Sequence, residues 1–260
     1  MGNDLEERPT GMTPPPPVRR CQQQARWTAQ LRQYLYGLAG LESARRVLEV
    51  GCGSGAVLAD FAGWNGQVLG VDLDRPALVE SQGQAGFARL QQADAGALPY
   101  AAHCFDLSLC HFLLLWVANP VATLQEMRRV TRAGGAVLAL AEPDYGGRVD
   151  YPPPLDEMGR RQAQGLARQG ADPLAGRKLS GWLYEAGLVD IRVGVLGGWW
   201  AEPPEEAEQA LEWQTLQHDL DGLASASELE KWRKIDATAW KTGQRVLYVP
   251  TFYGWGRVPG

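Results

Sequence analysis

Three alternate glycines, Gly51, Gly53 and Gly55, directly follow the short apolar segment 47–50, and they constrain the fold more than any other feature of the chain. Glycine has no side chain, so the backbone can turn sharply there and approach a ligand closely. We expect 47–50 to be a buried β-strand and 54–62 to be a helix whose free N–H groups face a nucleotide-like ligand. The alternative is a tight turn that binds nothing, and the loop alone does not decide between the two.

Strand-like and helical segments alternate along the chain. Strands are expected at residues 47–50, 68–72, 87–94, 105–110, 136–141, 188–196 and 246–255. Strands that alternate with helices form a parallel sheet with right-handed crossovers, and helices then cover both of its faces. The predicted fold class is therefore α/β, with a doubly wound, mostly parallel sheet whose last two strands form an antiparallel pair.

The chain divides into a tail and one domain. Residues 1–20 are polar and rich in proline and are predicted to be a flexible tail, and residues 21–260 form the domain. A helix is expected from Ala25 to Gly40, and its apolar residues share one side: Trp27, Leu31, Tyr34, Leu35 and Leu38. Two largely helical insertions, at about 144–172 and 199–243, are expected to form a lid.

Composition narrows the function. The net charge is −5, whereas a nucleic-acid or anionic-membrane partner would favour a basic face. The chain has no apolar run of roughly 18 residues, the length needed to span a bilayer, and its first residues lack the apolar stretch of a signal peptide. The four cysteines include no CxxC pair, so no metal site is predicted. We expect a cytoplasmic protein without nucleic-acid or membrane partners.

Two aspartates end the next two strands. Asp72 lies 21 residues beyond Gly51, where a carboxylate can accept hydrogen bonds from both hydroxyls of a ribose. Asp94 ends the third strand and could face an adenine amino group. The structural alternatives are a helix cap for Asp72 and a turn residue for Asp94. With the glycine loop, these carboxylates predict a ligand at the carboxyl edge of the sheet.

The main alternative function is that of a nicotinamide-dependent oxidoreductase. Gly51, Gly53 and Ala56 also satisfy the GxGxxA pattern of dinucleotide-binding loops. Glu49 argues against it, because a carboxylate two residues before the loop can order the loop and meet the cationic end of a different cofactor. The second half of the chain also lacks the repeated βαβαβ unit that a dinucleotide-binding sheet would have.

The combined motifs resemble those of the class I S-adenosylmethionine-dependent methyltransferases, in their small-molecule branch. The matching segments are 47–55, 70–74, 94–99, 105–115 and 124–135. The resemblance implies a seven-stranded sheet of order 3-2-1-4-5-7-6, S-adenosylmethionine as cofactor and methyl transfer as reaction. Two features depart from related patterns. Ala133 stands where the family usually has proline, and Cys110-His111-Phe112-Leu113 replaces the Asn/Asp-Pro-Pro-aromatic motif of enzymes that methylate nucleic-acid amino groups, which argues against that branch.

The resemblance also implies roles for individual residues around the cofactor. These are Glu49, Gly51, Cys52, Gly53 and Gly55 at the methionine end, Asp72 at the ribose, Leu73, Asp94 and Ala95 at the adenine, and Cys110 and His111 beside the sulfonium.

A protein base is needed only if the acceptor must lose a proton, so the sequence need not contain a catalytic dyad. Four residues that follow the expected strands 105–110 and 136–141 are candidates for catalysis or substrate contact: His111, Glu142, Asp144 and Tyr145. The alternatives are a histidine that hydrogen-bonds the backbone or the cofactor, and a turn built on Pro143. Arg26 and Arg32 could reach the cofactor carboxylate or be exposed helical residues.

The acceptor is expected to meet the last third of the chain, which is rich in tryptophan. The tryptophans in this part are Trp182, Trp199, Trp200, Trp213, Trp232, Trp240 and Trp255. Most are expected in the core, and the others would line a pocket for an apolar, aromatic or cationic small molecule. Three functions stay open: methyl transfer to a small metabolite, nicotinamide-dependent oxidoreduction, and a non-methylating use of S-adenosylmethionine on the same fold.

Overall fold

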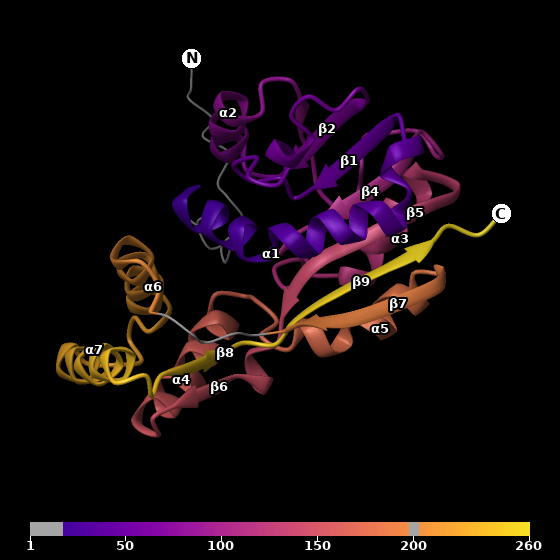
Figure 1. Cartoon of the computed structure of the whole chain (residues 1–260). Helices are drawn as coiled ribbons and strands as arrows, with labels where there is room; N and C mark the ends of the chain where they lie inside the picture. Colours follow the sequence, from indigo (N-terminus) through magenta and orange to yellow (C-terminus); the bar gives the residue numbers. More distant parts are fainter. Residues whose placement is uncertain (1–17, 198–202) are drawn as a thin grey trace, which may run out of the picture.

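A seven-stranded sheet runs through the centre of the structure, a computed structural model that describes residues 18–197 and 203–260 (Figure 1). Its strands are β1 (Arg46–Val50), β2 (Gln67–Asp72), β3 (Arg89–Gln92), β4 (Phe105–Cys110), β5 (Thr131–Pro143), β7 (Val189–Leu196) and β9 (Thr251–Arg257). Their order is β3-β2-β1-β4-β5-β9-β7, and β9 is antiparallel to both of its neighbours. Counted without the two short strands that lie outside this sheet, this is the order 3-2-1-4-5-7-6, so the predicted fold class is confirmed.

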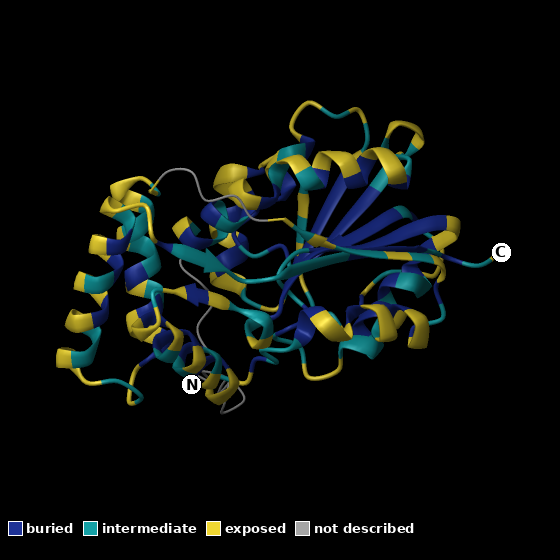
Figure 2. Cartoon of the chain, turned by 60° about the horizontal axis from the view of Figure 1, so that its bottom comes forward, coloured by how far each residue is buried: buried dark blue, intermediate teal, exposed yellow. Residues whose placement is uncertain are grey.

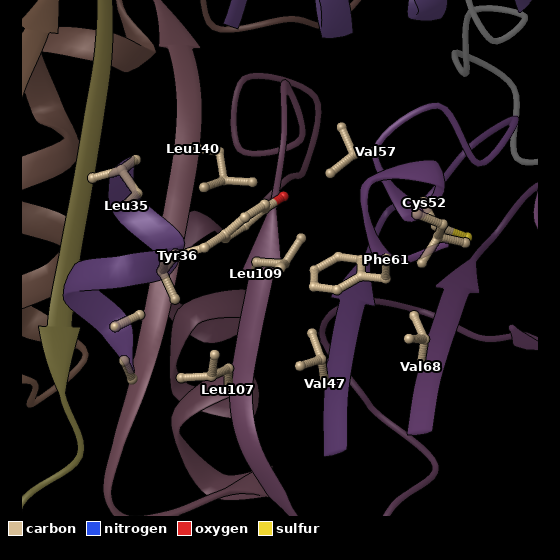
Figure 3. Packing of buried hydrophobic residues seen from close by; sticks show 14 of the residues in the cluster. Leu35, Tyr36, Val47, Cys52, Val57, Phe61, Val68, Leu107, Leu109 and Leu140 are labelled. Carbon is tan, nitrogen blue, oxygen red and sulfur yellow. The ribbon is translucent and has the colours of Figure 1, made fainter. Parts of the chain in front are cut away.

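Helices cover both faces of the sheet, as Figure 2 shows by the dark-blue strands between helices whose outer surfaces are yellow. The helices are α1 (Val18–Ala39) and α2 (Arg75–Gln84) on one face, with α3 (Pro120–Val130) and α5 (Ala175–Glu185) on the other. Under α1, Tyr36 and Phe61 pack against strand residues such as Leu109 (Figure 3). The apolar runs of β1, β4 and β5 are buried on both faces, which is typical of central parallel strands.

A second unit, which we call the cap, lies where β5 ends and β9 begins, at the carboxyl edge of the parallel strands (Figure 1). Its elements are η3 (Tyr145–Gly147), β6 (Val149–Tyr151), α4 (Pro154–Arg168), α6 (Glu206–Asp219), α7 (Ala226–Lys241) and β8 (Val246–Tyr248). It has its own apolar cluster, made of Leu155, Met158, Trp213, Leu216, Leu220 and Trp232. The cap occupies the insertions expected at 144–172 and 199–243, of which residues 199–202 lie outside the described chain.

Buried charges join the elements of the cap. Arg245, whose side chain is almost fully buried, pairs with Asp150 of β6 at 2.8 Å and with Asp236 of α7 at 2.6 Å. Gln162 of α4 donates a hydrogen bond to Asp219 of α6 at 2.8 Å. Because buried charges are costly unless they are paired, these contacts fix how the helices of the cap lie on one another.

The prediction of a helix at 54–62 is wrong. In this described segment the chain makes turns that lead into a short 3₁₀ helix, η2 (Leu58–Phe61). Gly53 and Gly55 have φ values of +49° and +81°, which a right-handed helix cannot contain. The loop therefore approaches a ligand with turn backbone and not with the first turn of an α-helix.

The strand expected at 246–255 is two strands. Pro250 has no N–H for a sheet hydrogen bond, and the chain leaves the ladder there. β8 pairs with β6 inside the cap, whereas β9 enters the main sheet. The third strand, expected at 87–94, is the shorter β3.

The expected boundary of the tail is also wrong. Helix α1 begins at Val18, so the predicted tail 1–20 includes the first helical residues; residues 1–17 lie outside the described chain. No helix in the described ranges has both the length and the apolar character needed to cross a membrane.

Candidate active site

The three glycines of the loop have different surroundings. Gly51, Gly53 and Gly55 all have positive φ values, of +71°, +49° and +81°. A side chain on Gly51 would collide with Leu113, and one on Gly55 would collide with Ser81, whereas one on Gly53 would meet nothing within 4 Å. The outer two glycines therefore allow close packing, and Gly53 leaves the backbone open to a ligand.

Asp72 lies directly against this loop at the end of β2. Its Oδ2 atom accepts a hydrogen bond from the N–H of Gly53 at 2.7 Å, and its Oδ1 atom accepts one from the N–H of Asp74 at 2.9 Å. Burial raises the pKa of Asp72, and these two N–H groups oppose that rise. The cap of α2 is Asp74, not Asp72, and Leu73 between them is 46% exposed. Asp72 therefore keeps acceptor capacity at the loop, beside an exposed apolar side chain.

Asp94 and Ala95 lie further along the same edge, because β3 is the neighbour of β2. Asp94 is exposed and stands two residues beyond the end of β3. Its Oδ1 atom accepts a hydrogen bond from the N–H of Gly96 at 2.7 Å, so the turn role expected as the alternative is present. Ala95 is partly buried and packs against the apolar cluster of the α3 face.

Glu49 is a buried carboxylate inside β1, and it is only 2% exposed. Its Oε2 atom is sealed from solvent and has no hydrogen-bond partner in the described part of the chain. Burial raises the pKa of Glu49 well above its ordinary value, and the positive charge of Arg32 opposes the rise. An unsatisfied carboxylate oxygen is costly in a dry site, so this position suits a ligand that brings a cationic donor.

His111 directly follows β4, and its ring contacts Thr28 of α1. Its Nε2 atom lies 2.9 Å from Oγ1 of Thr28, which also accepts a hydrogen bond from Arg32 at 2.6 Å. Burial lowers the pKa of His111 to about 3, and the charge of Arg32 adds to this effect. The imidazole is therefore neutral at ordinary pH.

Two cysteines that the sequence places at the cofactor direct their thiols into the core. Cys52 packs in the cluster between α1 and the sheet, where Figure 3 shows it near Val57 and Phe61. Cys110 is fully buried in the cluster on the other face, and burial raises its pKa well above the ordinary value. The thiols of these two residues are therefore not available to a ligand.

The carboxylate of Glu142 is hydrogen-bonded to the protein backbone. Its two carboxylate oxygens accept hydrogen bonds from the N–H groups of Leu113 at 3.1 Å, Leu114 at 2.9 Å and Leu115 at 3.1 Å. Burial raises its pKa to about 8, and these three N–H groups act in the opposite direction. Glu142 therefore fixes the backbone of the loop that follows β4.

Asp144 and Tyr145 follow directly on Glu142, past the end of β5. Asp144 is held by Arg177 of α5, whose Nε and Nη2 atoms donate to it at 2.6 and 2.9 Å. Tyr145 packs with Phe112 and Trp116 around a small apolar cluster, and burial raises the pKa of its hydroxyl group. Of the two, Tyr145 is the residue with a side chain available to a substrate.

Sequence reasoning missed the polar inner face of α1. Its expected apolar side is largely exposed: Trp27 is 46%, Tyr34 60% and Leu38 39% exposed. The residues that face inward are instead Arg20, Gln23, Ala25, Thr28, Arg32, Leu35, Tyr36 and Ala39. The signal was the spacing of polar residues every three to five positions, which the stronger apolar pattern obscured.

The inner polar residues of α1 connect the sheet to the cap. Arg20 pairs with Glu212 of α6, and Arg26 pairs with Glu208 of the same helix at 2.8 Å. Arg32 instead pairs with Asp60 of η2 at 2.7 Å and is buried. Of the two arginines weighed for the cofactor carboxylate, Arg26 is exposed and Arg32 is occupied by Asp60.

The chain is similar to known methyltransferases. A family model described as "Methyltransferase domain" matches residues 48–139. An uncharacterised methyltransferase of Schizosaccharomyces pombe is 27% identical over 188 residues, which are 67% of this chain and 67% of that protein. A ubiquinone/menaquinone biosynthesis C-methyltransferase of Bdellovibrio bacteriovorus is 33% identical over 120 residues, 44% of this chain and 49% of that protein.

Among solved structures, the Haemonchus contortus phosphoethanolamine N-methyltransferase 2 in complex with S-adenosyl-L-methionine has the same fold. The match has a TM-score of 0.57 at 12% identity and covers 92% of this chain and 57% of that one. The match spans about half the length of the quinone relative. The family model covers the glycine loop, Asp72 and the end of β4. Residues 48–139 match a methyltransferase domain, and the sheet order, the loop motifs and these relatives together support a class I S-adenosylmethionine-dependent methyltransferase.

Proposed function

We propose that this protein transfers a methyl group from S-adenosylmethionine to a small-molecule acceptor by in-line displacement. The observation that carries the proposal is the buried Oε2 atom of Glu49, which lacks a hydrogen-bond partner in the described chain. Glu49 lies near the end of β1, just before the loop in which the N–H of Gly53 donates to Asp72 and Gly53 has open space beside its backbone. The α-ammonium group of the cofactor would supply the missing donor and cation.

The other residues of the edge fit the remaining parts of the cofactor. Asp72 would hold the ribose hydroxyls, Leu73 would cover the adenine with its exposed side chain, and Asp94 with Ala95 would meet the adenine edge. The sulfonium supplies an already activated methyl group. The work left to this chain is to orient acceptor and donor and to exclude water, which is worth up to roughly 7–11 kcal/mol in well-oriented reactions.

The acceptor would enter between the cap and the end of β4. Trp213 and Trp232 are buried in the core of the cap, so the aromatic character of the entrance comes from Phe112, Trp116 and Tyr145. Aromatic walls favour an apolar, aromatic or cationic acceptor. The quinone-biosynthesis relative supports a small aromatic one, and the net charge of −5 argues against a nucleic-acid or anionic-membrane partner.

None of the four cysteines forms a disulfide, which supports the expected cytoplasmic compartment. The family match favours methyl transfer over nicotinamide-dependent oxidoreduction, which shares only the GxGxxA pattern. A non-methylating reaction on the same fold stays the second candidate, because fold does not fix chemistry.

Calorimetric titration with S-adenosylmethionine, S-adenosylhomocysteine and NADH tests the donor. We expect micromolar binding of the first two, and binding of NADH alone would overturn the proposal. Asp72→Ala and Asp72→Asn should each weaken cofactor binding at least about tenfold, by loss of ribose hydrogen bonds. Asp156→Ala, at an exposed position on α4, is the matched control and should bind as the wild type does.

Incubation of the enzyme and S-adenosylmethionine with fractionated metabolites tests the reaction. Accumulation of S-adenosylhomocysteine together with a methylated product is expected. Release of methylthioadenosine, or binding without turnover in any fraction, would favour the non-methylating alternative.

A further inference from the structure

Thr28 lies between a buried cation and the imidazole of His111. Its side chain is sealed inside the protein, and its Oγ1 atom accepts a hydrogen bond from Nη1 of Arg32 at 2.6 Å. The same oxygen lies 2.9 Å from Nε2 of His111. Arg32 cannot turn away, because it donates to both carboxylate oxygens of Asp60 and to the carbonyl of Ala25.

This arrangement favours one direction for the hydrogen bond between Thr28 and His111. The guanidinium donor takes one lone pair of Oγ1, and the hydroxyl hydrogen needs an acceptor. The carbonyl oxygens of Gln24 and Ala25 lie 3.2 and 3.4 Å away, which is farther than the 2.9 Å to Nε2. Donation along this shortest contact makes Nε2 the acceptor, and a neutral ring then carries its hydrogen on Nδ1.

Nδ1 of His111 is the ring nitrogen that Thr28 does not contact. It makes no hydrogen bond in the described part of the chain, and it is not among the side-chain atoms that are sealed from solvent without a partner. His111 directly follows Cys110, which pairs with Val50 of β1 just before the glycine loop. The ring is steadied by an edge contact with Phe112, at 4.7 Å between ring centroids.

We propose that Thr28 and Arg32 are positioning residues that fix His111 as a neutral Nδ1–H donor, directed at an oxygen atom of the ligand in the crevice. The inference rests on the proposed function and sharpens it. The acceptor then carries a carbonyl, carboxylate or hydroxyl oxygen close to the carbon, nitrogen or oxygen that receives the methyl group. His111 binds and orients that oxygen and does not remove a proton from it.

Nitrogen-15 NMR of the imidazoles tests the tautomer without any cofactor. The protein has three histidines, so His111→Asn identifies the signals of His111 by their loss. We expect the Nδ1–H tautomer in the wild type, unchanged from about pH 5 to about pH 8, the range in which an ordinary histidine titrates. The Nε2–H tautomer, or protonation within this range, would overturn the proposal.

Three threonine variants test the role of the hydroxyl group. Thr28→Val keeps the shape and removes the donor, so the ring should lose its single tautomer; Thr28→Ser keeps the hydroxyl and should restore it. Thr238→Val is the matched control, because the Thr238 hydroxyl bonds only a helix carbonyl on the exposed face of α7. An unchanged tautomer in folded Thr28→Val would contradict the positioning role.

Addition of S-adenosylhomocysteine tests the direction of the donor. Saturating ligand should shift the Nδ1–H signal of His111 and leave the signals of His103 and His218 in place. An unshifted signal with bound ligand would show that the donor does not face the crevice. If the ligand does not bind at all, the proposed function fails, whereas the tautomer measured in the free protein still decides the role of Thr28.

Discussion

The guanidinium of Arg32 donates to both carboxylate oxygens of Asp60, at 2.7 and 2.9 Å, and so joins the middle of α1 to the turn that follows the glycine loop. The side chain of Arg32 is 3% exposed and that of Asp60 is 15% exposed, so the pair lies largely out of water. The charge of the same guanidinium lowers the pKa of His111 and opposes the rise in the pKa of Glu49. One ion pair therefore orders the loop and sets the electrostatics of two site residues.

Asp60→Asn should be strongly destabilising, because it leaves the buried Arg32 without a counter-charge. We expect the free energy of unfolding to fall by about 3 kcal/mol, measured by urea denaturation. Asp156→Asn, which removes a partner of the exposed Arg160, should change it by less than about 1 kcal/mol. Equal effects of the two substitutions would mean that burial does not strengthen the Arg32 pair.

Substitutions at two neighbouring glycines should separate folding from binding. Gly53→Ala meets no neighbour, so it should cost only the roughly 1–2 kcal/mol of a left-handed alanine and mainly weaken S-adenosylhomocysteine binding, by more than about tenfold. Gly51→Ala collides with Leu113 and should chiefly lower the thermal midpoint. Calorimetry and thermal unfolding measure both quantities. Cofactor affinity of Gly53→Ala equal to that of the wild type would remove Gly53 from the site.

The pH dependence of stability should carry a contribution from His111. Its pKa is about 3 in the fold and 6.5 when unfolded, so the unfolded state binds more protons between these values. The stabilising contribution is complete above pH 6.5 and is lost as the pH falls towards 3, by at most roughly 4–5 kcal/mol. His111→Asn should weaken the pH dependence of the unfolding free energy between pH 3 and pH 6.5. His103 and His218 are present in both the wild type and the variant, so their contributions cancel in the comparison. Parallel curves for the two proteins would contradict the burial of a neutral ring.

Arg245→Met should loosen the cap and leave the sheet intact. The substitution removes the cation that pairs with Asp236, at a cost of about 3–5 kcal/mol, whereas Asp150 keeps its pair with Arg148. Hydrogen exchange should accelerate in α7 and β6 and stay slow in β1. Lys234→Met, which removes the partner of Glu230 from an exposed pair, is the control and should exchange as the wild type does. Uniform acceleration across the chain would show that the cap does not open separately.

The sheet could be predicted from sequence because its signals are local and repeated. Each central strand is an uninterrupted apolar run followed by a turn, and right-handed crossovers then leave few possible orders. The position of Asp72 beside the glycine loop was predictable for the same reason, since a strand end fixes where its side chain lies. The short sheet of β6 and β8 was missed because it pairs segments almost 100 residues apart, and no local pattern predicts such a pairing.

The polar side of α1 shows why site residues are harder to predict. Periodicity assigns Trp27, Tyr34 and Leu38 to the core, but the interior next to this helix contains carboxylates and a histidine. Arg32 and Thr28 are buried because their partners lie on η2 and after β4, and those partners become neighbours only when the sheet has formed. The helix predicted at 54–62 is absent for a related reason, because glycines with positive φ values, which allow the tight turns of this loop, are incompatible with a right-handed helix.

The separate core of the cap has a consequence for how the chain can diverge. Trp213, Trp232 and Leu155 pack on one another and not on the clusters of the sheet. Mutations within this apolar cluster should therefore leave the packing under the glycine loop largely undisturbed, and the reverse also holds. With the acceptor bound at the cap and the donor at the loop, as proposed, acceptor preference and donor binding can change under independent selection, so that descendants of one ancestor would keep the same methyl donor while their substrates become unrelated.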